Sequence, residues 1–252
     1  MKTPAAILVV LIGALLLYAA TDLPKWGDPA SPASASPVSS HFIAETGVDT
    51  EVLNMVTAVL ADYRGFDTMF ETVVIFIAGV AILAILKRTG ADAEKAPAGR
   101  ADAAAETSDL IVTNTVRLLV PVLQLFAFYV LAHGHVSPGG GFQGGVIMGA
   151  SFILVALAWD LPAAMNRLSV DRAVALAAVG ILIYGGIGLF SMVLGGEFLD
   201  YAELSHVLPV SREMARYHAM LGVEIGVGFT VAAIMFAIYA CLSTRGRLAA
   251  GL

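Results

Sequence analysis

Six long apolar stretches limit what this 252-residue chain can fold into. The hydrocarbon core of a bilayer is about 30 Å thick, so a spanning helix needs roughly 20 apolar residues. Each stretch is close to that length, and the alternation that is typical of membrane strands is absent. We therefore predict an all-α polytopic membrane protein. The predicted spans are Ala5–Ala20, Met69–Leu86, Leu110–Ala132, Gly140–Trp159, Ala173–Leu194 and His218–Cys241.

The composition excludes several classes of function. Only 13% of the residues are charged, about half the share of an ordinary soluble domain, and 58% are hydrophobic. With a net charge of −6 there is no basic stripe for phosphates, so nucleic acid is not expected as a partner. Cys241 is the only cysteine, which excludes a disulfide framework and a cysteine-ligated metal cluster. We predict no cofactor and no enzymatic activity, because no nucleophile–base constellation is present.

The distribution of lysine and arginine predicts the orientation. If all six stretches span and the N-terminus is cytoplasmic, nine basic residues lie in inside loops and four lie outside, with Arg117 inside a span. Cytoplasmic loops usually carry the positive excess. Both termini are therefore expected in the cytoplasm, at the inner (plasma) membrane. The first stretch, ending in Tyr18-Ala19-Ala20, also has features of a cleaved signal peptide, but a retained helix is favoured.

Two polar connectors interrupt the chain. Ser31–Ser40 lies in a proline-containing Ser/Ala tract and is predicted to be an exposed flexible loop. Ala91–Ser108 contains no large apolar residue and is predicted to be a cytoplasmic linker. Thr50–Leu60 is predicted to be a short helix in the outer interface or docked on a partner, with one apolar face made of Val52, Leu53, Val56, Val59 and Leu60. The predicted organisation is a unit at 1–90 with two spans and an external loop, the linker at 91–108, and a unit at 109–252 with four spans.

The most distinctive segment is the glycine loop, Ser137–Gly145, with the sequence Ser-Pro-Gly-Gly-Gly-Phe-Gln-Gly-Gly. Its G-x-G-x-x-G spacing is no evidence for a nucleotide site, because it lies between two apolar spans and no strand precedes it. Proline and glycine permit a sharp re-entry of the chain into the membrane. Glycines four residues apart then form a smooth helix face for close packing. The residues assigned to this packing loop are Pro138, Gly139, Gly140, Gly141, Phe142 and Gly145.

Ionisable residues at membrane depth are the candidate functional groups, because a charge in hydrocarbon costs about 3 kcal/mol or more. Asp67 and Glu71 are four residues apart, so they share one helix face where the second span begins. The alternative is structural: Thr68 and Glu71 form a capping box, and Arg64 pairs with Asp67. Glu224 lies well inside the last span, where it either binds a proton or cation or serves as a packing residue.

Three further ionisable groups lie on or beside the third span. Arg117 either extends to the cytoplasmic surface or pairs with a carboxylate of a neighbouring subunit. His133 and His135 lie at the outer end of this span. Hydrogen bonding that fixes the loop is their favoured role, with proton relay as the alternative. Two residues apart and without an adjacent acid, they do not predict a metal site.

His133-Gly134-His135, followed by the glycine loop, resembles the signature of the B subunit of multisubunit Na⁺/H⁺ antiporters, the Mrp or Mnh family. The resemblance covers roughly residues 109–243 and includes Gly222–Gly228 of the last span. Asn54–Thr68, together with Glu71, is similar to the C-terminal tail of the large A subunit. In membrane-bound hydrogenases a similar tail is a separate small subunit. The chain therefore resembles a fusion of an A-subunit tail and a B subunit.

The resemblance implies secondary transport, with protons moving inward and sodium moving outward. The implied partners are subunits of the A, C, D, E, F and G types within the lipid bilayer. The resemblance also implies that acids at Asp67 and Glu71 belong to the ion route. No lysine lies inside a predicted span, so a non-pumping subunit is expected.

Three hypotheses for its role remain open. In the first, the chain lines the cation path, and Asp67, Glu71 and Glu224 supply oxygen ligands suited to sodium. In the second, the chain is a scaffold of the same complex. In the third, it belongs to the ion-translocating arm of a hydrogenase-type redox complex.

Overall fold

The computed structural model describes residues 2–32, 34–93, 110–244 and 246. All the regular structure in these ranges is helical. Six of the helices are long and apolar enough to cross a membrane, which confirms the prediction of an all-α polytopic protein. Which way the termini face stays a prediction, and residues 94–108 of the predicted linker lie outside the described ranges.

Two compact units are distinguished, Met1–Glu45 and Thr46–Leu252. In the first, α1 (Lys2–Ala19) is apolar along its length, and none of the candidate span Thr3–Asp22 is buried. The helix α2 (Pro37–Thr50) begins at a proline, a residue favoured in the first turn because its missing N–H needs no partner there. The loop predicted at 31–40 is therefore wrong from residue 37 onward.

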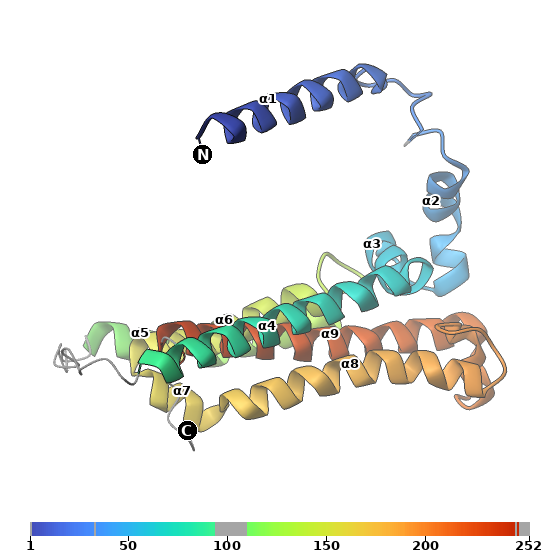
Figure 1. Cartoon of the computed structure of the whole chain (residues 1–252). Helices are drawn as coiled ribbons and strands as arrows, with labels where there is room; N and C mark the ends of the chain where they lie inside the picture. The colour runs from blue at the N-terminus through green and yellow to red at the C-terminus, as the bar shows by residue number, and fades with distance from the viewer. Residues whose placement is uncertain (1, 33, 94–109, 245, 247–252) are drawn as a thin grey trace. The chain divides into compact units, whose positions relative to one another are not determined.

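The helix α9 (Arg212–Ser243) is the centre of the second unit. Its most apolar window is 67% buried, the highest share among the candidate spans. It packs directly against α8, α6 and α4, while α5 packs mainly on α6 (Figure 1). The short helix α7 (Leu161–Arg167) connects α6 to α8. The bounds of the surrounding helices are α4 (Gly65–Ala93), α5 (Leu110–Ala132), α6 (Gly141–Ala158) and α8 (Val170–Val193).

Small residues let α8 and α9 approach closely. Gly180 and Gly226 face each other so tightly that a Cβ on either would collide with the backbone oxygen of the other. Beside them, the hydroxyl of Thr230 donates a hydrogen bond to the carbonyl oxygen of Ala177 at 2.9 Å. This is the geometry of membrane helices that pack through small residues and bond across the interface.

A second close contact joins α6 to α9. Gly141, Gly145 and Gly149 share one face of α6, and a Cβ added to any of them would lie 3.0 Å or less from a carbonyl oxygen of α9. The structure thus places the face formed by these glycines against a helix of the same chain. Consequently, α6 and α9 approach each other without large side chains between them.

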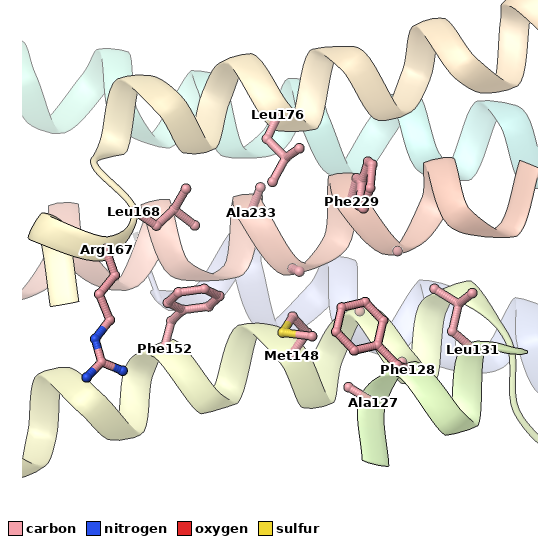
Figure 2. A pocket seen from close by; sticks show the side chains of 14 residues that line it. Ala127, Phe128, Leu131, Met148, Phe152, Arg167, Leu168, Leu176, Phe229 and Ala233 are labelled. Atoms are coloured by element: carbon pink, nitrogen blue, oxygen red, sulfur yellow. The ribbon is translucent and has the colours of Figure 1, made fainter. Parts of the chain in front are cut away.

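An apolar groove of about 230 Å³ lies between α5 and α6 on one side and α8 and α9 on the other (Figure 2). Phe128, Met148 and Phe229 are among its lining residues, and Arg167 is the only charged one. The arginine lies at one end of the groove, at the connection between α7 and α8 (Figure 2).

The segment before α4 is less regular than predicted. Residues 51–54 are not helical, and Glu51 has a φ of 54°. Helix α3 (Met55–Ala58) follows and runs into a π-helical turn, η2 (Val59–Tyr63). Val52 is fully buried whereas Leu53 is 77% exposed, so the single apolar face predicted for Thr50–Leu60 is wrong. Val52 and Leu53 lie in the non-helical stretch between α2 and the Asn54 cap of α3, so they do not share a helix face with the residues of α3.

Candidate functional site

Glu224 lies inside α9, facing the turn that joins α5 to α6, and is only 8% exposed. A Cβ on Gly140 would lie 2.6 Å from its Oε1, and a Cβ on Gly134 would lie 3.1 Å from its Oε2. Gly140 also has a φ of +123°, which other residues rarely adopt. Only glycine therefore allows the loop to lie against this carboxylate.

His135 is an ionisable side chain beside Glu224. Its Nδ1 lies 3.8 Å from Oε2 of Glu224, beyond hydrogen-bonding distance, and the ring is almost fully buried against the ring of Tyr217. Burial lowers the pKa of His135, and His218 lowers it further, whereas the backbone of Tyr217 raises it. A lowered pKa keeps the imidazole neutral near neutral pH. The two groups are thus neighbours rather than a permanent ion pair.

Hydrogen bonding at this pair is incomplete. Both ring nitrogens of His135 and Oε2 of Glu224 are buried without a hydrogen-bond partner among the described residues. Buried polar atoms are nearly always paired, so each exception calls for an explanation. The carboxylate oxygen can accept a proton, a cation or a hydrogen bond from water, and the neutral imidazole has one N–H donor and one acceptor nitrogen.

A small cavity of about 60 Å³ lies beside Glu224, large enough for at least one water molecule. Its wall comes from distant parts of the sequence: the α3–α4 segment, the glycine loop, α8 and α9. The lining residues are Val56, Thr57, Leu60, Ala61, Thr68, Gly139, Gly140, Gly141, Phe142, Gln143, Tyr184, Val223, Glu224 and Val227.

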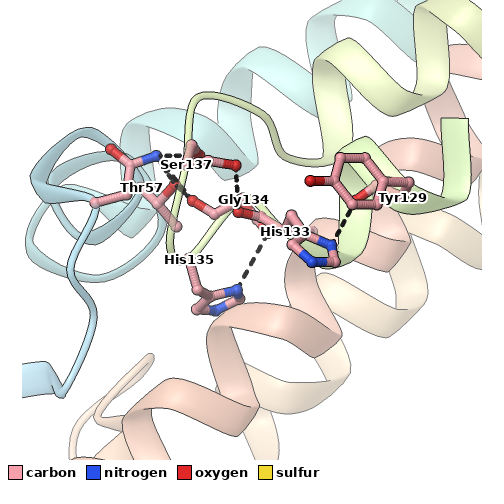
Figure 3. A network of polar contacts seen from close by, with 8 residues as sticks. Thr57, Tyr129, His133, Gly134, His135 and Ser137 are labelled. Atoms are coloured by element: carbon pink, nitrogen blue, oxygen red, sulfur yellow. Dashed lines mark hydrogen bonds and ion pairs between the residues drawn. The ribbon is translucent and has the colours of Figure 1, made fainter. Parts of the chain in front are cut away.

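Asn54 and Thr57 hold the loop that carries His135, and Figure 3 shows Thr57 beside Gly134 of that loop. The Asn54 side-chain amide donates to the carbonyl oxygens of Gly134 at 2.8 Å and Ser137 at 2.9 Å. Its backbone N–H donates to the carbonyl of His135 at 2.9 Å. Thr57 adds a hydroxyl bond to Gly134 at 2.6 Å. We call these four bonds the clasp. The sequence placed Asn54 and Thr57 in the segment that resembles the A-subunit tail, but it did not predict either as a site residue.

His133 has a different environment from His135, although only Gly134 separates the two in the sequence. It is exposed, its ring stacks on Tyr129 with the centroids 4.0 Å apart, and its Nδ1 lies 3.2 Å from the Tyr129 carbonyl oxygen (Figure 3). The carbonyl of His133 accepts bonds from the backbone and hydroxyl of Ser137. His133 thus supports the loop from outside, whereas His135 reaches the buried carboxylate.

Asp67 and Glu71 do not lie with Glu224. Both are exposed on α4, and neither lines the cavity. Arg64 donates to Asp67 through Nε at 2.6 Å, as the structural alternative expected. The capping box is wrong: α4 begins at Gly65, and the hydroxyl of Thr68 instead donates to the carbonyl of Leu60 at 2.7 Å. The extra turn before Thr68 moves the helix start away from it.

The glycine loop and Arg117 complete the predicted residues. Gly140, Gly141 and Phe142 line the Glu224 cavity with Gly139, and Gly145 faces α9. Pro138 is exposed at the start of the loop. Arg117 is exposed on α5 and lines a separate cavity with Arg167. Among the described residues, no group of three His, Cys, Asp or Glu side chains is arranged to hold a metal ion.

An ion pair fastens the η2 segment to α9 near the site. Arg216 donates to both carboxylate oxygens of Asp62, at 2.6 and 2.8 Å, and to the carbonyl of Asp49 at 3.0 Å. Tyr63 donates its hydroxyl to Asp49 at 2.7 Å. Burial and the Asp49 carboxylate raise the pKa of Tyr63 to about 12, so this hydroxyl stays protonated at physiological pH.

Comparisons with known proteins place the chain in a family. Residues 111–237 match the family described as "Domain related to MnhB subunit of Na+/H+ antiporter". The chain belongs to the MnhB family. Residues 29–100 match a second family, MbhE, which is named for one of the subunits of MBH. Both matches agree with the two resemblances seen in the sequence, and the MnhB match includes both histidines, the glycine loop and Glu224.

Relatives of the MnhB region include "Putative antiporter subunit mnhB2" from Staphylococcus aureus strain Newman. It is 30% identical over 136 residues, which cover 54% of this chain and 95% of the relative. The protein of that name from strain JH1 matches equally. Thus nearly the whole relative corresponds to about half of the present MnhB-family chain.

Two solved structures resemble the fold. A chain of the Mrp complex from Dietzia sp. DQ12-45-1b superposes with a TM-score of 0.71 at 27% identity; the match covers 98% of the present chain but 26% of that longer one. A chain of the membrane-bound sulfane sulfur reductase, an archaeal respiratory membrane complex, gives 0.62 at 24% identity, covering 93% and 97%. The second match supports the fold alone. The chain is thus a multi-pass membrane protein with the helical fold of the matched part of the Mrp complex chain.

Proposed function

We propose that this chain is a non-pumping membrane subunit of a multisubunit cation/proton antiporter. Support comes from the MnhB family match, the antiporter subunits among its relatives and the similarity to a chain of the Mrp complex. None of the six candidate spans found among the described residues contains a lysine, which supports a non-pumping role. It acts as a transporter subunit rather than an enzyme, its partners are the other antiporter subunits, and Na⁺ and H⁺ are the transported ions.

Within that complex we infer that Glu224 binds a proton or a sodium ion during transport. The observation that carries this inference is the buried Oε2 atom, which has no hydrogen-bond partner among the described residues and sits beside a cavity. A carboxylate at this depth is unfavourable unless a proton, a cation or water compensates its charge. Its oxygen atoms suit a hard cation such as Na⁺.

The acids on α4 have a different place in this proposal. Asp67 and Glu71 are exposed on the chain itself, so they contribute to an ion route only where a partner subunit covers that face of α4. Arg64 already compensates Asp67, which leaves Glu71 as the more available carboxylate. The ion route therefore consists of two parts, one enclosed by this chain at Glu224 and one shared with a neighbour at Glu71.

Replacing Glu224 by glutamine in the whole complex tests the proposal. Glutamine keeps the size of the side chain but cannot carry the charge or exchange a proton. We expect normal assembly on blue-native gels and a loss of cation-dependent proton movement in everted membrane vesicles. Glu213→Gln, in the first turn of α9 and outside the Glu224 cavity, is the matched control and should transport normally. Normal transport by a fully assembled Glu224→Gln complex would falsify the role of Glu224.

A second candidate is membership in the ion-translocating arm of a redox complex. The match of residues 29–100 to the MbhE family favours it specifically. Affinity purification of the tagged chain distinguishes the two, because a redox complex co-purifies with subunits that bind iron–sulfur clusters. An antiporter complex without those subunits contradicts this candidate.

A further inference from the structure

Two arginines lie near one end of the bundle without an acidic partner. Arg117 on α5 and Arg167 at the end of α7 line a cavity of about 350 Å³, together with Gln124 and Trp159. Neither forms an ion pair with any residue that the structure describes. Asp171, the nearest acid to Arg167 along the chain, is exposed in the first turn of α8, and no ion pair joins the two. Asp160 is engaged as the cap of α7, where its Oδ1 accepts from Ala163 N at 2.7 Å.

The depth of this cavity corresponds to the boundary between headgroups and acyl chains. The hydroxyl of Thr113 donates to the carbonyl of Ala158, the last residue of α6, which sets the two helix ends at one level. Arg117 lies four residues further along α5, about 6 Å deeper. Trp159 lines the same cavity, and tryptophan is enriched at membrane–water interfaces.

The apolar groove of Figure 2 begins at the same arginine. Arg167 lines both cavities, and the other lining residues of the groove are apolar or glycine. In Figure 2 its side chain lies at one end, and the groove extends past Phe152 and Met148 toward Leu131. A cationic end joined to an apolar channel matches a molecule that has an anionic head and a hydrocarbon tail.

We propose that the two cavities together bind one anionic phospholipid. Its phosphate contacts the guanidinium groups of Arg117 and Arg167, and one acyl chain occupies the groove. Guanidinium groups bind phosphate oxygens through paired N–H bonds. Two positive charges with no facing carboxylate select a lipid of net negative charge over a zwitterionic one, whose cationic headgroup they repel. The orientation predicted from the lysine and arginine distribution puts this end in the cytoplasmic leaflet, whose anionic lipids attract basic groups.

Lipid analysis of the purified complex tests the proposal. Complexes with wild-type chain, with the double variant Arg117→Gln/Arg167→Gln and with Arg172→Gln are washed in detergent, and their retained phospholipids are quantified by mass spectrometry. Arg172 lies in the first turn of α8 and lines neither cavity, so it serves as the matched control. We expect anionic phospholipid to be retained by the wild type and the control and lost from the double variant.

A second variant tests the acyl chain separately. Leu176→Trp fills the groove from α8 and leaves both arginines unchanged. It should also lose the lipid, which keeps the proposal testable if the double variant does not fold. A complementary measurement adds phosphatidylglycerol or phosphatidylcholine to the delipidated complex. Only phosphatidylglycerol should raise the Tm of the wild type, and neither should raise that of the double variant.

Three outcomes overturn the proposal. The first is equal retention of anionic lipid by the wild type and the double variant. The second is equal stabilisation by the two lipids. The third is loss of a partner subunit from the double variant without a change in bound lipid, which means that the arginines pair with an acidic residue of that subunit.

Discussion

At the scale of single residues, the site depends on two glycines, because glycine has no side chain to fill the space beside Glu224. A Cβ added to Gly140 would collide with Oε1 of Glu224, and a Cβ added to Gly134 would lie 3.1 Å from Oε2. The sequence predicted that the glycine loop turns the chain back into the membrane and serves close packing, with no part in ion chemistry. In the structure the same loop both packs on α9 through Gly141 and borders a buried carboxylate through Gly140.

Gly140→Ala should therefore impair both stability and transport. The added methyl group collides with Oε1 of Glu224, and the φ of +123° is strained for alanine, by about 1–3 kcal/mol. Thermal unfolding of the purified complex and vesicle transport measure the two effects. Gly185→Ala on α8 is the control, since nothing lies within 4 Å of its added Cβ and its effect should be small. Equal behaviour of the two variants would contradict this account.

At the scale of secondary structure elements, the segment α3–η2 positions the site although it contributes no charge to it. Asn54 caps α3 with its Oδ1 and uses its amide N–H₂ on the loop, so one side chain satisfies both elements. Thr68 donates to Leu60 across the junction of η2 and α4. π-helical turns leave carbonyls with altered partners and are frequent at functional sites.

Asn54→Ala is expected to loosen the loop that carries His135. The substitution removes the side-chain bonds to Gly134 and Ser137 and the cap of α3, a loss of about 1–3 kcal/mol in the free energy of unfolding. The fall in Tm of the purified complex measures it, together with faster hydrogen exchange in residues 133–140. Asn114→Ala, on the exposed surface of α5, is the control and should leave both unchanged.

At the scale of the whole molecule, hydrogen bonds and an ion pair join the regions that match the two families. The Tyr184 hydroxyl of α8 donates to the carbonyl of Gly65 at 2.8 Å, and the Asp62–Arg216 pair joins η2 to α9. Together with the clasp and the packing of α4 on α9, these contacts make residues 46–93 part of the same compact unit as the MnhB region. The Glu224 cavity exists only because both regions supply its walls.

Charge removal at the Asp62–Arg216 pair tests this coupling. Their side chains are only 9% and 23% exposed, so Asp62→Asn or Arg216→Gln should each leave a partly buried charge uncompensated. Each single variant is expected to be less stable by about 2–4 kcal/mol. The double variant Asp62→Asn/Arg216→Gln should be less destabilised than the sum of the two. Simple additivity of the three Tm shifts would show that the pair is not coupled.

Parts of this picture could be predicted from particular residues. The third span, Leu110–Ala132, has the predicted bounds, and the last two spans begin three and six residues earlier than predicted, at Val170 and Arg212. Those helices start at the serine caps Ser169 and Ser211, which lie outside the apolar run. The loop-fixing role of His133 also follows from its position. The burial of His135 could not be predicted, because residues close together in one turn can face opposite sides.

The sequence by itself determined that this chain is a bundle of membrane helices and which family it resembles, because hydrophobic length and local motifs are properties of contiguous residues. The tertiary structure alone decided which acid is enclosed. Asp67, Glu71 and Glu224 are all carboxylic acids in or beside apolar stretches, but of the three only Glu224 is buried. It is buried because glycines of one loop and small residues of α9 bring distant backbone segments into contact around it. Burial of a charge depends on what packs over it, and that is decided by segments far apart in the chain.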